Sequence, residues 1–146
     1  MTTNNTTQLA INEILQNFAS SYNERNIEKI LSLFAMDDDV SVFGTGSDEY
    51  RIGRKEIYKQ ILRDFTQSDS LTISIKNSSI SSIGLVAWAH GKFELNAVSQ
   101  NQSIQVEMRF SMIFENRSEH WLIQHAHFSV TQENQEEGYS FPNLNP

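Results

Sequence analysis

Two histidines near the C-terminal end, His125 and His127, have the spacing that most directly suggests chemistry. A separation of two residues on a β-strand places both side chains on one face. Such a pair ligates a metal when a third ligand joins it, and His90 or Glu107 are the available choices. The sequence positions neither of them, and histidines in a pocket wall are more often hydrogen-bonded to neighbours. We therefore predict no metal and no other cofactor, and keep both histidines as candidate ligand-binding residues.

Arg109 is the candidate cation of the interior. Simple alternation puts it on the polar face of its strand with Glu107 and Ser111, where it would pair with a carboxylate. A bulge or bend would instead turn it inward, as an anchor for a carboxylate or carbonyl group. In the second interpretation, Arg109 with His125 or His127 forms an anion site whose affinity increases as the pH falls.

Four further side chains are candidates for the same pocket. Tyr22 lies at the end of the first helical pattern, so its hydroxyl could reach the interior. Trp88 and His90 share one face of a strand. The alternative to a role in the pocket is that they pack under the helices or contact a second subunit. Glu49 follows a Gly-Thr-Gly turn. Glu49 and His127 are the two candidate general bases, although an acidic residue before a helix also complements the helix dipole.

The composition excludes several classes of function. The chain has 146 residues, 38% of them hydrophobic, which is enough for one well-buried core. A net charge of −7 without a basic cluster argues against nucleic-acid binding, and the lack of cysteine excludes disulfides and thiolate chemistry. No apolar run is long enough for a membrane span or a signal peptide, so we expect no membrane partner and a cytoplasmic location.

The elements that position the candidate residues are helices in the first part of the sequence and strands in the second part. Helical spacing of apolar residues, with Thr6 or Thr7 and then Asn26 as N-caps, predicts three helices. Their apolar stripes cover residues 11–22, 27–34 and 57–65, and a short strand at Val40 to Phe43 lies between the second and the third.

From Leu71 to about Thr131 the apolar residues alternate, which is typical of strands. Short turns at Asn77–Ser82, Ser99–Gln102 and Glu115–His120 favour an antiparallel meander. We predict a single α+β domain over residues 1–146, with residues 1–6 and 132–146 as extended or flexible tails.

Three stretches carry a resemblance to a known family. They are Tyr22-Asn-Glu-Arg-Asn-Ile through Ala35, Phe43-Gly-Thr-Gly-Ser-Asp-Glu49 with Gly53, and the two strands Arg109–Phe114 and Trp121–Ser129. Across residues 7–142 the chain resembles the SnoaL-like branch of the nuclear transport factor 2-like superfamily, and its last strand is also similar to the association domain of calcium/calmodulin-dependent protein kinase II. The resemblance implies a cone-shaped fold in which three N-terminal helices pack on a strongly curved antiparallel sheet. It also implies that the strand arginine and the final-strand histidine line the cavity.

The departures from this pattern limit the function. The ketosteroid isomerase pattern within the superfamily would place proton-handling groups at Phe18, Val42 and Phe110, none of which moves a proton. The strands hold no aspartate after Asp69, which also disfavours epoxide hydrolase and scytalone dehydratase chemistry.

We therefore expect a pocket protein that binds an apolar small molecule with an anionic or carbonyl end. An isomerase or cyclase using His127 or Glu49 as base, and a non-enzymatic dimerisation or association module, are the alternatives. A homodimer through the outer face of the sheet is expected because large residues such as Trp88 and Trp121 lie opposite other apolar sets, and three helices cover only one face.

Overall fold

A computed structural model describes residues 4–143, and within them the first half of the chain forms three helices. They are α1 (Asn5–Asn23), α2 (Ile27–Ser32) and α3 (Arg54–Thr66). The side chain of Asn4 accepts a hydrogen bond from the Thr7 amide and so caps α1 two or three residues before the predicted start. Asn26 caps α2 in the same way, as the sequence predicts.

Six strands form one sheet in the order β2-β1-β6-β5-β4-β3. Their bounds are β1 (Ser41–Phe43), β2 (Tyr50–Ile52), β3 (Ser70–Ile83), β4 (Val86–Ser99), β5 (Gln102–Arg117) and β6 (His120–Val130). Strands β3 to β6 make the predicted antiparallel meander. The sheet as a whole is mixed, because β1 pairs in parallel with β6, and β2 was not predicted.

One predicted turn is wrong. Residues 77–82 continue β3 through a bulge between Ile75 and Asn77, and the chain reverses only at Gly84 and Leu85. At the bulge the carbonyl oxygen of Asn77 comes so close to Gly91 of β4 that any Cβ on residue 91 would clash with it. Gly91 therefore lets the two long strands stay paired where the sheet bends.

A second bulge lies where β6 pairs with Ile113 and Phe114 of β5, and it changes which face of the sheet the following β6 side chains occupy. Phe114 pairs with Ile123 and Ile113 with His125, so Gln124 is the extra residue. Ile123 and Ala126 are both fully buried although they are three positions apart. His125, His127 and Ser129 consequently face away from the side on which Ile123 lies.

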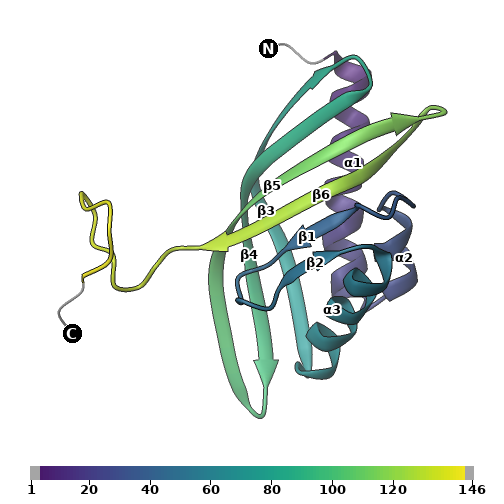
Figure 1. Cartoon of the computed structure of the whole chain (residues 1–146). Coiled ribbons are helices and arrows are strands. Elements are labelled where there is room, and N and C mark those ends of the chain that lie inside the picture. The colour runs from purple at the N-terminus through teal and green to yellow at the C-terminus, as the bar shows by residue number, and fades with distance from the viewer. Residues whose placement is uncertain (1–3, 144–146) are drawn as a thin grey trace.

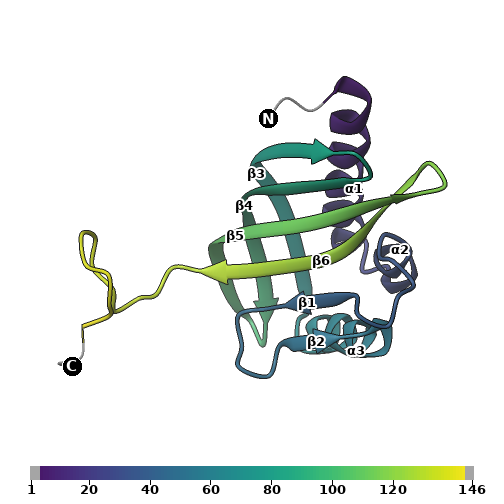
Figure 2. The ribbon, with the colours of Figure 1, turned by 45° about the horizontal axis from the view of Figure 1, so that its top comes forward.

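The helices cover the inner, concave face of the sheet and leave the outer face open (Figures 1 and 2). The largest fully buried side chains belong to this inner layer: Ile11, Leu15, Ile30, Ile57, Phe114 and Ile123. After Val130 the chain runs away from the sheet in both views, and Tyr139 and Phe141 on this segment are exposed. No helix among residues 4–143 is long and apolar enough to cross a membrane.

Candidate functional site

A cavity of about 270 Å³ lies between α1, α3 and the concave face of the sheet. Its walls are mainly apolar and come from α1 and all four long strands: Phe18, Leu71, Ile73, Phe93, Met108 and Phe128. The volume is slightly below the range of ~300 to 1,000 Å³ typical of pockets for drug-sized ligands. The cavity therefore suits a small, mainly apolar molecule.

Five polar side chains line the same cavity: Tyr22, Thr45, Glu49, Gln60 and Asp64. Tyr22 is on α1, one turn after the wall residue Phe18. Gln60 and Asp64 are one turn apart on α3 and therefore share a face of that helix. Glu49 is on the loop between β1 and β2, so three separate segments converge here.

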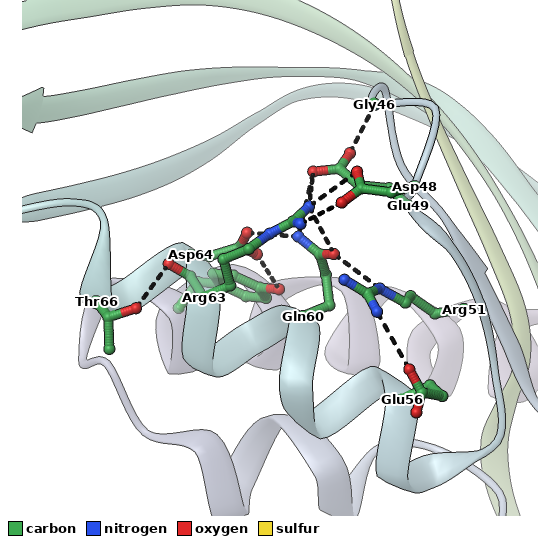
Figure 3. Close-up of polar contacts among 10 residues, drawn as sticks. Gly46, Asp48, Glu49, Arg51, Glu56, Gln60, Arg63, Asp64 and Thr66 are labelled. Carbon is green, nitrogen blue, oxygen red and sulfur yellow. Dashed lines mark hydrogen bonds and ion pairs between the residues drawn. The ribbon is translucent and has the colours of Figure 1, made fainter.

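Hydrogen bonds connect Glu49 and Asp64 through Gln60, whose side chain is buried (Figure 3). Its amide nitrogen donates to Oδ1 of Asp64 at 2.8 Å and to Oε1 of Glu49 at 3.2 Å. Its amide oxygen accepts from Arg51 and Arg63. With both ends of the amide engaged, Gln60 fixes the spacing of the two carboxylates.

Glu49 is held from its other side by the loop and by α3. The Gly46 amide donates to its Oε2 at 2.8 Å, and Nη2 of Arg63 lies 3.0 Å from its Oε1. Arg63 also pairs with Asp48, at 2.6 Å. A Cβ at residue 44 would overlap the Glu49 carboxylate, so the glycine of the Gly-Thr-Gly turn leaves room for that carboxylate.

Asp64 is the carboxyl group whose acidity the site changes most. Burial raises its pKa to about 6, and the neighbouring charge of Glu49 adds to this, while hydrogen bonds from Gln60 and Tyr22 and the charge of Arg63 act in the opposite direction. Burial and the nearby Asp64 also raise the pKa of Tyr22 well above its usual value, which keeps its hydroxyl protonated. The cavity thus contains a permanent hydroxyl donor beside a carboxyl group that titrates near neutral pH.

The structure brings two of the predicted site residues, Tyr22 and Glu49, to this cavity. The other five lie on the outer face of the sheet and do not line it: Trp88, His90, Arg109, His125 and His127. For Arg109 the simple alternation holds, because β5 keeps Met108 and Phe110 inward on either side of it. For the two histidines, the bulge in the β5–β6 pair fixes the outward face.

The outer-face candidates make other contacts. Arg109 donates to the carbonyl of Val130, at 3.1 Å. His125 Nδ1 is hydrogen-bonded to the Ser41 hydroxyl at 2.8 Å, and partial burial together with His127 lowers the pKa of His125. Within residues 4–143 no group of three His, Asp or Glu side chains is arranged to hold a metal ion.

The sequence reasoning missed Gln60 and Asp64. Their signal was present, because both lie at helical spacing within the apolar stripe that includes Ile57, Ile61 and Phe65. Polar residues at i and i+4 inside such a stripe must find buried partners or line a cavity.

A family model described as a SnoaL-like domain matches residues 11–133. The chain therefore belongs to the SnoaL-like domain family. No curated protein matches it in sequence.

Solved structures agree on the fold. A nuclear transport factor 2-like superfamily protein from Salmonella enterica superposes with a TM-score of 0.81 at 19% identity, covering 92% of this chain and 98% of that one. A protein from Xanthomonas campestris, provisionally named as a calcium/calmodulin-dependent protein kinase II association domain, gives 0.74 at 21% identity, covering 84% and 86%. A provisionally named aromatic ring hydroxylase from Novosphingobium aromaticivorans gives 0.81 at 14%, covering 90% and 93%. These comparisons confirm the predicted cone-shaped α+β fold and the family resemblance.

Proposed function

We propose that this protein binds a small, mainly apolar molecule inside the cone, with the polar end of the ligand at Tyr22, Asp64 and Glu49. The observation that carries this proposal is the union of an apolar cavity with one convergent group of polar side chains. Two of these polar groups are carboxylates, which when ionised only accept hydrogen bonds. The ligand is therefore expected to present a hydrogen-bond donor.

The sequence suggested an anionic or carbonyl end for the ligand, based on Arg109 and the histidines. Those groups lie on the outer face, so they provide no positive charge inside the cone. A carbonyl could still accept from the Tyr22 hydroxyl, whereas an anion would meet the Asp64 and Glu49 carboxylates. We therefore propose the same pocket, but a ligand whose polar end is a hydrogen-bond donor and not an anion.

A fragment screen by ligand-observed NMR tests the pocket. Leu95 lines the cavity and Ile83 lies exposed at the end of β3, so Leu95→Trp fills the cavity while Ile83→Trp is the matched control. Fragments bound by the wild type should bind Ile83→Trp but not Leu95→Trp. Unchanged binding to Leu95→Trp, or no fragment bound at all, would contradict the proposal.

An enzyme of the proton-transfer kind is the second candidate. It is favoured by the pKa of about 6 for Asp64, which suits a general acid or base near neutral pH. Glu49 also lines the cavity, whereas His127 does not. Similar structures include provisionally named dehydratases and a hydroxylase. Turnover of a bound fragment that is lost in Asp64→Asn while the fragment still binds would support this candidate, and turnover that survives would remove it.

A homodimer through the outer face is the partner we propose. An aromatic and apolar patch spans β2, β1, β6, β5 and β4 there, and we call it the outer patch: Phe43, Tyr50, Trp88, Ile113, His125 and His127. Phe43 stacks on Tyr50 with ring centroids 4.1 Å apart, and both histidine rings lie edge-on to Phe43. Tyr50 is 65% and Ile113 43% exposed, which favours a second copy as cover. The cytoplasmic location stays a prediction.

A further inference from the structure

The cavity contains a half-buried carboxylate, Asp64, without a cationic partner. We propose that the ligand of this pocket is a protonated amine, whose ammonium group pairs with Asp64 while its apolar body lies among the aromatic rings of the cone. This inference rests on the proposed function, because it names the class of molecule that occupies the same pocket.

Asp64 contacts only neutral hydrogen-bond donors among the described residues. Its oxygens accept hydrogen bonds from Gln60, at 2.8 Å, and from the Tyr22 hydroxyl, at 3.4 Å. Both donors are neutral, and no ion pair within residues 4–143 includes Asp64. Carboxylates withdrawn from water are normally paired with a positive charge. An ammonium group in the cavity would provide the missing partner.

The arginines near Asp64 are paired with other carboxylates. Arg63, the nearest guanidinium in sequence, pairs with Asp48 at 2.6 Å and with Glu49 at 3.0 Å. Arg51 pairs with Glu56 at 3.1 Å. Arg63 is therefore occupied by Asp48 and Glu49, and Asp64 adds a third carboxylate beside them. This local excess of negative charge has the same sign as the net charge of −7. The site attracts a small cation and repels an anion.

Aromatic rings form the wall of the cavity next to this charge. Phe18 lies 5.0 Å from Tyr22 and 6.0 Å from Phe128 between ring centroids, and Phe128 lies 5.7 Å from Phe93. All four rings line the cavity. Aromatic faces attract cations, and the attraction is stronger where water is excluded. A neutral alcohol of the same shape would gain the apolar contacts but neither charge interaction.

The pH dependence of binding follows from the groups that face Asp64. These are Tyr22 from α1, Gln60 and Arg63 from α3, and Glu49 from the β1–β2 loop, while the long strands contribute only apolar side chains to the cavity. In the free protein Asp64 takes up a proton as the pH falls through about 6. A bound ammonium group favours the ionised carboxylate and lowers its pKa. Amine affinity is therefore full above this pH and is lost below it.

The test compares 2-phenylethylamine with its neutral counterpart 2-phenylethanol by calorimetric titration. For the wild type near pH 7.5 we expect the amine to bind at least about tenfold more tightly than the alcohol. Near pH 5, where about nine-tenths of Asp64 is protonated, we expect this preference to be about tenfold smaller. Asp64→Asn should remove the preference at both pH values and keep alcohol binding. Asp39→Asn, which changes an exposed carboxylate on the loop before β1, should leave the preference intact.

Each outcome is decisive. Equal binding of the two probes, or tighter binding of the alcohol, overturns the amine assignment and leaves the pocket in place. Binding of neither probe also overturns it, and the fragment screen then decides separately whether a pocket exists. Loss of the preference in Asp39→Asn as well would show that net charge, and not Asp64, attracts the amine. The wild-type pH profile carries the test if Asp64→Asn does not fold.

Discussion

The hydroxyl of Tyr22 donates a hydrogen bond to Oδ2 of Asp64 at 3.4 Å and links α1 to α3 across 42 positions of sequence. Each group shifts the pKa of the other. The Asp64 charge helps to keep the Tyr22 phenol protonated, and the hydrogen bond from Tyr22 favours the ionised form of the Asp64 carboxylate. The raised pKa of Asp64 shows that burial and repulsion outweigh that hydrogen bond. A carboxyl group whose pKa is raised in this way lowers the stability of the fold at neutral pH.

Asp64→Asn is expected to stabilise the protein at neutral pH. In the folded state the pKa of Asp64 lies at about 6 instead of 3.8, so the folded state holds the proton more tightly and loses stability as the pH rises from about 4 to 6. The loss is at most about 3 kcal/mol, since one pKa unit corresponds to about 1.4 kcal/mol. Thermal unfolding between about pH 4 and 8 should show the gain of Asp64→Asn growing through this window. A constant difference across the range, or the same gain in Asp39→Asn, would contradict the assignment.

Gln60→Leu should destabilise the fold by about 1 to 3 kcal/mol, because it removes the donor that the half-buried carboxylates of Glu49 and Asp64 share. Denaturant unfolding measures the change. Gln67→Leu, on the exposed residue after α3, is the control and should stay within about 0.5 kcal/mol of the wild type. Equal effects of the two variants would show that the Gln60 network contributes nothing to stability.

Phe114→Ala should cost about 3 to 5 kcal/mol, because the ring is fully buried under the helices and its removal leaves a cavity. The matched change Phe141→Ala removes a ring that is 79% exposed on the C-terminal segment, and it should have almost no effect on unfolding. If Phe141→Ala lowers the stability of the protein markedly, that segment packs on the body in solution or on a second copy.

Ile113→Glu should convert the proposed dimer into a monomer. The substitution places a charge in the middle of the outer patch, where it would be buried against the second copy without a partner. Light scattering at micromolar concentration is the measurement. Leu9→Glu, on an exposed position of α1, should leave the dimer intact. A wild-type protein that is already monomeric would refute the dimer.

The sequence predicted most of the architecture because apolar spacing reports which side of an element is buried. The three helices and the long strands other than β3 follow this spacing, with errors of a few residues at their ends. The continuation of β3 through residues 77–82 was missed, since a run of polar residues has no alternation and resembles a turn. Strand β2, three residues placed directly before α3, was not predicted.

The site was less predictable, because it depends on registers that local patterns do not determine. The bulge that turns His125 and His127 outward arises from the pairing of β5 with β6, and neither strand shows it alone. Tyr22 and Glu49 were found from local chemistry. Gln60 and Asp64 were overlooked because their neighbours on α3 indicated a simple core-facing helix, although polar residues at i and i+4 in that stripe are informative.

The parallel pairing of β1 with β6 has a consequence for how the chain folds. Ser41 is hydrogen-bonded to His125, 84 positions later, so β1 has no partner in the sheet except β2 until nearly the whole chain is available. Contacts of such large sequence separation are entropically costly to close and slow the folding of a domain. During synthesis, β1 can take its place beside β6 only after the last strand has left the ribosome. The wall of the cavity that β6 provides, with Phe128, is also absent until then.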